Sequence, residues 1–188
     1  ILLVGCGSQE EFSSRKLNQI TADVIQKLQQ SKINEATFFL PELNIEGSDI
    51  ARRIEQIIIQ AEYSCYQSDA LKTDKKNNSK ALKRITLFIG DSSSLATARQ
   101  ALITGQAIAS GVNLARQLGD LPGNICTPSY LADQAKELAR DFKMKAKILN
   151  EKAMEKLSMG SLLSVSRGSR QEARLIILEH KGGADKDA

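Results

Sequence analysis

The stretch Leu95–Leu118, LATARQALITGQAIASGVNLARQL, decides how this chain is organised. Small and apolar residues recur along it in steps of three and four, at Leu95, Ala98, Leu102, Gly105, Ala109 and Val112. This spacing predicts one helix with a single apolar face. At about 1.5 Å per residue it would span roughly 35 Å, the width of a small domain. A helix of this length predicts a connector packed between two domains.

A second unit is predicted to begin after this helix. Gly119–Gly123 combines glycine with proline, the two residue types that end helices. Thr127 then offers an N-cap and Pro128 a first helical residue. The expected buried stripe of that helix is Leu131, Ala135, Leu138, Ala139 and Phe142. Short apolar runs beyond it predict a helix at Glu151–Leu157 and strands at Lys147–Leu149, Leu162–Val165 and Leu175–Leu178.

The residues before the connector also alternate between strand and helix patterns. Strands are predicted at Ile1–Cys6, Ala36–Leu40 and Ile85–Ile89, and helices around Leu17–Leu28 and Ile50–Ala61, the second capped by Ser48 or Asp49. We therefore predict an α/β fold with a largely buried first sheet. The predicted division is residues 1–93, a connecting helix at 94–118, and a second α/β domain at 119–188.

Composition narrows the class of protein. The 188 residues are 41% hydrophobic and 26% charged, with a net charge of +4, as expected of a soluble globular protein and not of a nucleic-acid-binding tail. No apolar run reaches the roughly 18 residues of a membrane span, and Ile1–Val4 is too short for a signal peptide. Three widely spaced cysteines, Cys6, Cys65 and Cys126, suit a reducing compartment. We expect a soluble, cytoplasmic protein.

Both ends of the chain suggest a fragment. Residue 1 is not Met and already lies in a strand-like run, and Gly182–Ala188 reads as a polar loop. We therefore expect the chain to be an internal piece whose two α/β units are both incomplete.

Four motifs have both a functional and a structural interpretation. Gly5-Cys6-Gly7 follows an apolar run, but Glu10 stands where a dinucleotide site needs its third glycine, so a simple turn is favoured. His180 is the only histidine and has no neighbour at metal-ligand spacing. Arg167–Arg170 suits an anion-binding turn and a plain turn equally well. The basic segment lacks interleaved aromatics, which favours a solvated loop; its residues are Lys72, Lys75, Lys76, Lys80, Lys83 and Arg84.

Three ordered blocks carry a resemblance to a known family. Val112–Leu118, followed by Leu121–Pro128 and Tyr130–Ala132, resembles the connector signature of leucyl aminopeptidases of the M17 type. Met159–Ser169 (MGSLLSVSRGS) is similar to the next block of that family. Leu175–Gly182 (LIILEHKG) is similar to the strand after it, although the family usually has Tyr where His180 stands. The resemblance is weaker before Val112 but extends over the whole chain.

The resemblance implies a fold and a chemistry. It implies a macro-domain-like amino-terminal domain, a long connecting helix and the first elements of a catalytic domain. It further implies a hexameric enzyme that removes amino-terminal residues from peptides with two divalent cations, manganese or zinc. The family's lysine, aspartate and glutamate ligands match no position here and are expected beyond Ala188. The resemblance thus implies no catalytic or metal-binding residue in this chain, which alone is predicted to be inactive.

Two other functions remain open from the sequence. The basic segment and the isoelectric point of about 9.0 support a DNA-binding or regulatory role as the alternative. Nucleotide binding by the first domain ranks last, because no phosphate-cradling loop is present.

Overall fold

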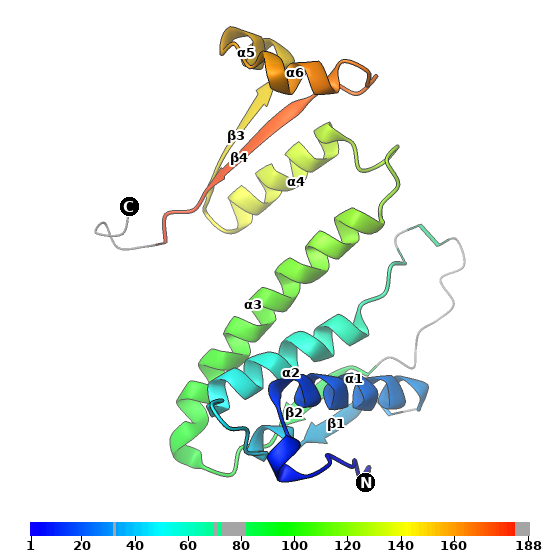
Figure 1. Cartoon of the computed structure of the whole chain (residues 1–188), viewed down its shortest axis with the longest axis vertical. Helices are drawn as coiled ribbons and strands as arrows, with labels where there is room; N and C mark the ends of the chain where they lie inside the picture. The colour runs from blue at the N-terminus through cyan, green and yellow to red at the C-terminus, as the bar shows by residue number, and fades with distance from the viewer. Residues whose placement is uncertain (32, 70, 73–81, 183–188) are drawn as a thin grey trace. The chain divides into compact units, whose positions relative to one another are not determined.

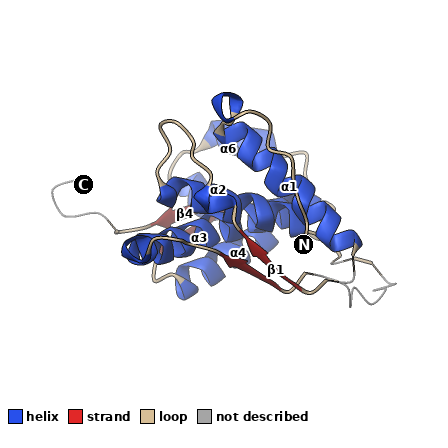
Figure 2. Cartoon of the chain, turned by 90° about the horizontal axis from the view of Figure 1, so that it is seen from below, coloured by secondary structure: helices blue, strands red, loops and turns tan. Residues whose placement is uncertain are grey.

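The computed structural model describes residues 1–31, 33–69, 71–72 and 82–182. It divides the chain into two units, Ile1–Gln117 and Leu118–Ala188, which are described separately below. Most of the described chain is helical, and its strands are short (Figure 2). The predicted α/β class is confirmed.

The first unit is a β-α-β arrangement with two further helices (Figure 1). Strand β1 (Glu35–Phe38) pairs in parallel with β2 (Arg84–Leu87), and helix α2 (Ile50–Cys65) lies between them in sequence. Helix α1 (Ser14–Gln30) precedes β1 and runs beside α2. Single 3-10 turns stand at Gln9–Glu11, Leu40–Glu42 and Ser92–Ser94. Helix α3 (Leu95–Asp120) follows, and all but its last three residues belong to this unit.

Local signals set the helix ends. The Asp49 carboxylate accepts a hydrogen bond from the Arg52 amide at 2.8 Å, so Asp49, and not Ser48, caps α2. The Ser13 hydroxyl accepts from the Lys16 amide in the same way at the start of α1. These caps satisfy amides that have no partner in the first helical turn.

Helix α2 separates two apolar clusters. On one side it contributes Ile57 and Ala61 to a core with α1, β1 and the adjoining turns, whose other buried members are Phe12, Leu17, Ile20, Val24, Ile25, Leu28, Phe38 and Ile45. On the other side Ile54 and Ile58 pack against Ala98 and Ala101 of α3. The largest fully buried side chains of this unit include Leu17, Ile25, Ile54 and Ile57. Because α2 is buried on two sides, it is the central element of the unit.

The second unit pairs two antiparallel strands with three helices. Helix α4 (Pro128–Asp141) contacts strands β3 (Lys145–Asn150) and β4 (Arg174–Glu179), and α5 (Glu151–Lys156) and α6 (Gly160–Ser166) lie between the strands in sequence. The predicted start of α4 is confirmed, because the Thr127 hydroxyl accepts from the Tyr130 amide at 3.2 Å. Buried alanines line α4, namely Ala132, Ala135 and Ala139.

Several local predictions were wrong. Residues 1–6 form no strand, and Ile1 and Leu3 are exposed, because no described strand pairs with them. Residues Leu162–Val165 belong to helix α6, since a four-residue apolar run does not distinguish strand from helix. The first sheet is not largely buried, and along its two described strands Phe38 is the buried residue. Phe142, Leu95 and Val112, expected on buried stripes, are exposed.

Candidate functional site

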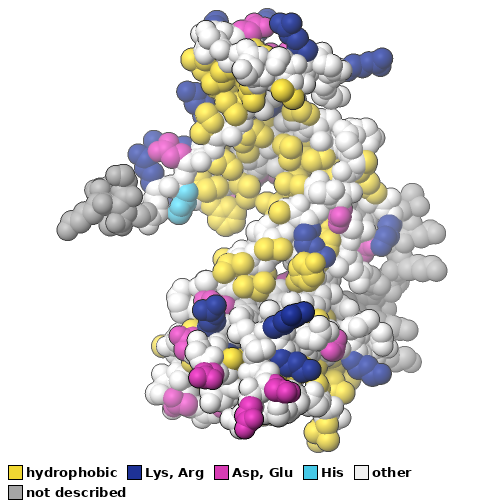
Figure 3. Space-filling view, in the orientation of Figure 1, with side chains coloured by type: hydrophobic (Ala, Val, Ile, Leu, Met, Phe, Trp, Pro, Cys, Tyr) yellow, Lys and Arg dark blue, Asp and Glu magenta, His cyan; other side chains and the backbone are white. Residues whose placement is uncertain are grey.

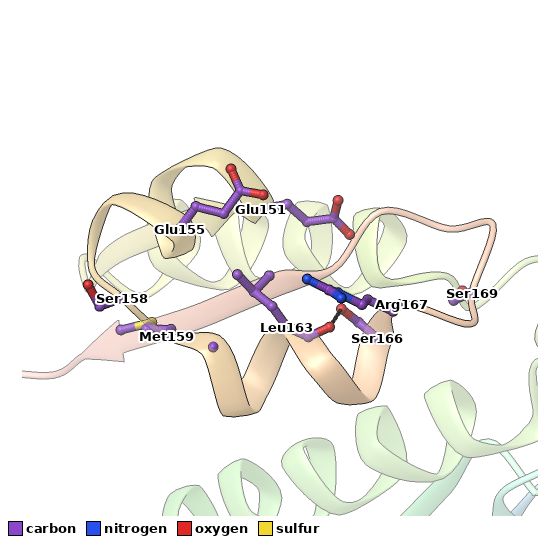
Figure 4. A pocket seen from close by; sticks show the side chains of 9 residues that line it. Glu151, Glu155, Ser158, Met159, Leu163, Ser166, Arg167 and Ser169 are labelled. Carbon is purple, nitrogen blue, oxygen red and sulfur yellow. Dashed lines mark hydrogen bonds between the residues drawn. The ribbon is translucent and has the colours of Figure 1, made fainter.

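A groove of about 460 Å³ lies between α5 and α6 of the second unit (Figure 4). Its lining combines charged, hydroxyl and apolar side chains from both helices and from the turns at their ends. The lining residues are Glu151, Glu155, Ser158, Met159, Gly160, Leu163, Ser166, Arg167 and Ser169. A volume in this range suits a small molecule, since ligand pockets measure about 300–1,000 Å³.

Helix α5 forms the acidic wall of the groove. The Asn150 side chain caps the helix by accepting from the Ala153 amide at 2.9 Å. Glu151 and Glu155 stand four residues apart and therefore share one face of the helix. The Glu151 carboxylate also accepts from the Ala173 amide at 2.9 Å, which ties α5 to the residues before β4.

Helix α6 and the turn after it form the opposite wall. Leu163 and Arg167 stand four residues apart, and Figure 4 shows both side chains directed toward the wall that carries the two glutamates. The Ser166 hydroxyl donates to the Leu163 carbonyl oxygen at 3.1 Å. Leu163 and Met159 are half-buried and give the groove an apolar strip.

The surroundings of the turn at Arg167–Arg170 do not favour an anion. It follows the carboxyl end of α6, where the helix dipole is negative. The Ser169 amide donates to the Ser166 carbonyl oxygen at 2.9 Å, and the Gln171 amide donates to the Ser169 hydroxyl at 3.0 Å. These two amides are occupied and the helix end is unfavourable to an anion, so the plain turn is the better interpretation.

An ion pair lies in the segment that leads from the groove into β4. The Arg174 guanidinium lies 2.8 Å from the Glu172 carboxylate. This hydrogen-bonded contact lowers the pKa of Glu172 and raises the pKa of Arg174. Glu172 therefore stays ionised at neutral pH and contributes to stability above its ordinary pKa, a contribution that is lost as the pH falls.

The described residues do not fit a metal centre. Within residues 1–31, 33–69, 71–72 and 82–182, no group of three His, Cys, Asp or Glu side chains is arranged to hold an ion. Acidic side chains of the second unit pair instead with near neighbours: Asp133 with Lys136, Glu137 with Gln134, Asp141 with Arg140, and Glu179 with Lys181. His180 is exposed just after β4. Two of the acidic residues after the connector, Asp185 and Asp187, lie outside the described residues.

The glycine turn near residue 7 and the described part of the basic segment show local structural roles. Gly7 has a positive φ of 81°, a conformation that glycine adopts without strain, and Glu10 is exposed in a 3-10 turn. Of the basic segment, Lys72 pairs with Asp69, and Arg84 lies 3.2 Å from Glu35. Lys75, Lys76 and Lys80 lie outside the described residues. No helix in the described part of the chain is long and apolar enough to span a membrane.

Sequence reasoning missed the groove for an identifiable reason. The spacing of Glu151 and Glu155 was visible, but Leu162–Val165 of the opposite wall was predicted as a strand and Arg167–Arg170 as a turn. That arrangement has no helical turn that would bring Leu163 and Arg167 to the same face opposite α5. The sequence did allow a helix here, because Gly160 is followed by seven residues that include neither glycine nor proline.

Comparison with known proteins gives the same result for both halves of the chain. The model of the cytosol aminopeptidase family, N-terminal domain, matches residues 1–75, and that of the catalytic domain of the same family matches residues 113–188. A probable cytosol aminopeptidase of Nitrosomonas europaea is 42% identical over 187 residues, covering 100% of this chain and 38% of the relative. One of Nitrosococcus oceani is 43% identical over 187 residues, covering 99% and 37%. The chain thus spans little more than a third of these relatives.

Solved structures show the same fold. The bottromycin maturation enzyme BotP superposes with a TM-score of 0.82 at 22% identity, covering 96% of this chain and 37% of BotP. The structure of BotP in complex with Mn gives a TM-score of 0.80 at 21% identity, covering 95% and 36%. At this identity the likeness concerns the fold. The family models and curated relatives support the aminopeptidase interpretation and not the DNA-binding alternative.

Proposed function

Because this chain belongs to the cytosol aminopeptidase family, we propose that it forms part of an enzyme that removes amino-terminal residues from peptides. The observation that carries the proposal is the match of both family domains, in order, along a chain that aligns with its relatives over its whole length. We place this enzyme in the cytoplasm, in keeping with the name of those relatives.

The proposed enzyme uses two divalent cations, manganese or zinc, and acts on peptides as a homo-oligomer, with a hexamer as the expected assembly. When bound, such ions polarise a carbonyl and supply a nucleophilic water. The described residues of this chain do not fit that group, since they bring no three ligating side chains together. We therefore propose that the described residues of this chain supply no catalytic or metal-binding residue.

The role proposed for this chain is structural. Residues 1–93 form an amino-terminal domain, 94–118 a connecting helix, and 119–188 the opening elements of the catalytic domain. Small residues along α3 let it approach α2 closely, as the contacts of Gly105 with Glu55 and Ile58 illustrate. This close packing holds α3 against α2 within the first unit.

A chimera tests the function. The chain replaces the corresponding segment of the Nitrosomonas europaea relative, with which it is 42% identical. We expect the chimera to cleave leucine p-nitroanilide, to lose activity to a chelator, and to regain it with manganese or zinc. The isolated 188-residue chain is expected neither to cleave the substrate nor to bind manganese tightly.

Two results would contradict the proposal. Metal-dependent turnover by the isolated chain, free of contaminating peptidase, would place catalytic residues within it. A chimera that folds and assembles like the active relative, yet cleaves no peptide substrate, would show that this segment does not serve an aminopeptidase.

A further inference from the structure

The charged side chains of the α5–α6 groove lie on opposite walls. Glu151 and Glu155 come from α5, and Arg167 comes from the end of α6 (Figure 4). Glu155 lies at the end of the groove near Ser158 and Met159, whereas Arg167 and Ser169 lie at the other end. The groove therefore presents two carboxylates spaced along one wall and a guanidinium across from them.

These charges are available to a ligand. Glu155 and Arg167 are exposed, and among the residues that the structure describes their side chains have no ion-pair or hydrogen-bond partner. Glu151 forms no ion pair within salt-bridge distance among the described residues, although its charge acts on Arg174, and one of its carboxylate oxygens accepts from the Ala173 amide. An ionised carboxylate accepts through two oxygens, so the second one remains free.

The net charge of the lining selects the charge of the ligand. The side chains that line the groove carry two carboxylates and one guanidinium, one excess negative charge, and the neighbouring Arg174 is paired with Glu172. A complementary ligand carries two cationic groups and one anionic group. Charge-assisted hydrogen bonds of this kind are about twice as strong as neutral ones, and Arg binds carboxylates through two parallel bonds.

We propose that this groove binds a free basic α-amino acid, lysine or arginine. The α-carboxylate pairs with Arg167, and the α-ammonium pairs with the free oxygen of Glu151. The side-chain cation reaches Glu155, one helical turn along α5, where residues four apart lie about 5–6 Å from each other. The methylene chain between the two cations lies against the apolar strip of Leu163 and Met159.

The same chemistry excludes related molecules. A residue inside a peptide offers Arg167 a neutral carbonyl in place of a carboxylate, which forms a weaker hydrogen bond. An apolar amino acid leaves Glu155 without a partner. A diamine without a carboxylate leaves Arg167 without a partner, so each of the three charges contributes to selection. The inference concerns binding by this chain alone and does not depend on the proposed peptide hydrolysis.

Titration of the 188-residue chain by calorimetry and NMR tests the proposal. The probes are L-lysine, L-norleucine, which lacks the side-chain amine, and cadaverine, which lacks the carboxylate. We expect saturable binding of one lysine per chain at neutral pH, with norleucine and cadaverine each at least about tenfold weaker. Shifted amide signals are expected at α5 and α6.

Two substitutions assign the contacts. Glu155→Gln should weaken lysine about tenfold and leave norleucine unchanged, whereas Arg167→Gln should weaken lysine and leave cadaverine unchanged. Glu137→Gln and Arg140→Gln, which alter exposed charges on α4, are the matched controls and should change none of these affinities.

The proposal is overturned if lysine and norleucine bind equally, or if no saturable binding of lysine or arginine is found. It is also overturned if Glu155→Gln binds lysine as the unaltered chain does while the amide spectrum shows an intact fold. Binding of a divalent cation in place of lysine, with loss in the same Glu155→Gln variant, would reassign the groove to a metal and likewise reject it.

Discussion

The Arg116 guanidinium lies over the Tyr63 ring, 4.0 Å from its centre, and donates a hydrogen bond to the Tyr63 carbonyl oxygen at 2.9 Å. The same guanidinium lies 4.1 Å from the centre of the Tyr66 ring. Tyr63 belongs to the last turn of α2, Tyr66 follows that helix, and Arg116 belongs to α3. One cation thus joins the carboxyl-terminal parts of the two helices.

Replacing Arg116 tests the strength of this contact. Arg116→Ala should lower the free energy of unfolding of the first unit by about 1–2 kcal/mol, the range for a cation between partly exposed rings. Arg116→Lys should lower the free energy of unfolding by a smaller amount, because an ammonium keeps the charge but cannot stack flat on the rings. Urea unfolding followed by tyrosine fluorescence measures both, since the chain has no Trp. Arg99→Ala, an exposed arginine of the same helix, is the control and should be near neutral.

Gly105 sets the closest approach of α3 to α2. A Cβ atom at this position would lie 3.1 Å from the Ile58 Cβ and 3.2 Å from the Glu55 Cα. Gly105→Ala should therefore destabilise the unit by about 1 kcal/mol or more, because the backbone of α2 must move. This outweighs the higher helix propensity of alanine, worth about 1 kcal/mol.

Gly111 of the same helix is the matched comparison. Apart from the neighbouring backbone of α3 itself, no atom of the described residues lies within 4 Å of a Cβ built there, so Gly111→Ala keeps the propensity gain and should stabilise the unit by about 0.5–1 kcal/mol. Denaturation midpoints of the two variants should move in opposite directions. A shift of both in the stabilising direction would show that α3 and α2 are not in close contact at Gly105.

Leu102 and Ile103 differ in burial although they are neighbours in sequence. Leu102 is half-buried against the cluster of Ile54, Ile58, Ala98 and Ala101, whereas Ile103 is 59% exposed. Leu102→Glu should cost about 2 kcal/mol or more, because a carboxylate enters an apolar cluster. Ile103→Glu should change stability by less than about 0.5 kcal/mol. Equal losses of stability in the two variants would mean that Leu102 is not the side chain that packs against the cluster.

The stability of the segment before α3 is expected to depend on pH through the Asp91 carboxylate. This carboxylate accepts from the Ser93 hydroxyl and amide and from the Ser94 hydroxyl, and these hydrogen bonds lower its pKa below the ordinary value of 3.8. The bonds favour the ionised form in the folded state, so their contribution is complete above pH 3.8 and is lost as the pH falls through the lowered pKa.

NMR titration of the Asp91 carboxyl group measures this effect. Ser93→Ala removes the largest cause and should return the pKa toward its ordinary value. The stability advantage of the unaltered chain over Asp91→Asn should be constant near neutral pH and shrink in acid. A pKa of Asp91 at or above 3.8 in the unaltered chain would contradict the assignment.

Exposed hydrophobic side chains remain on both units, as the space-filling view shows (Figure 3). They include Ile108 of α3, and Ile177 and Leu178 of β4. Their exposure explains why Leu95, Val112 and Phe142 could not be placed from the sequence: periodicity identifies the apolar face of a helix but not whether another element covers it.

The sequence by itself determined the elements whose signals are local. The helix cap at Thr127, the narrowing of the α2 cap to Ser48 or Asp49, the approximate length of α3 and the membership of both halves in one family all follow from residues close together in the chain. Caps and 3.6-residue periodicity act within one or two turns, so no knowledge of distant contacts is needed.

Tertiary structure decided the features that depend on partners far apart in sequence. Helix α6 replaced a predicted strand, and residues 1–6 form no strand, because a strand requires a neighbour with which to share hydrogen bonds. The contact of Arg116 with Tyr63 and the facing of Arg167 and Glu151 across a groove join residues that no local pattern relates. Side-chain packing and charge pairing between separate elements act only once the chain has folded, which is why these sites appeared in the structure alone.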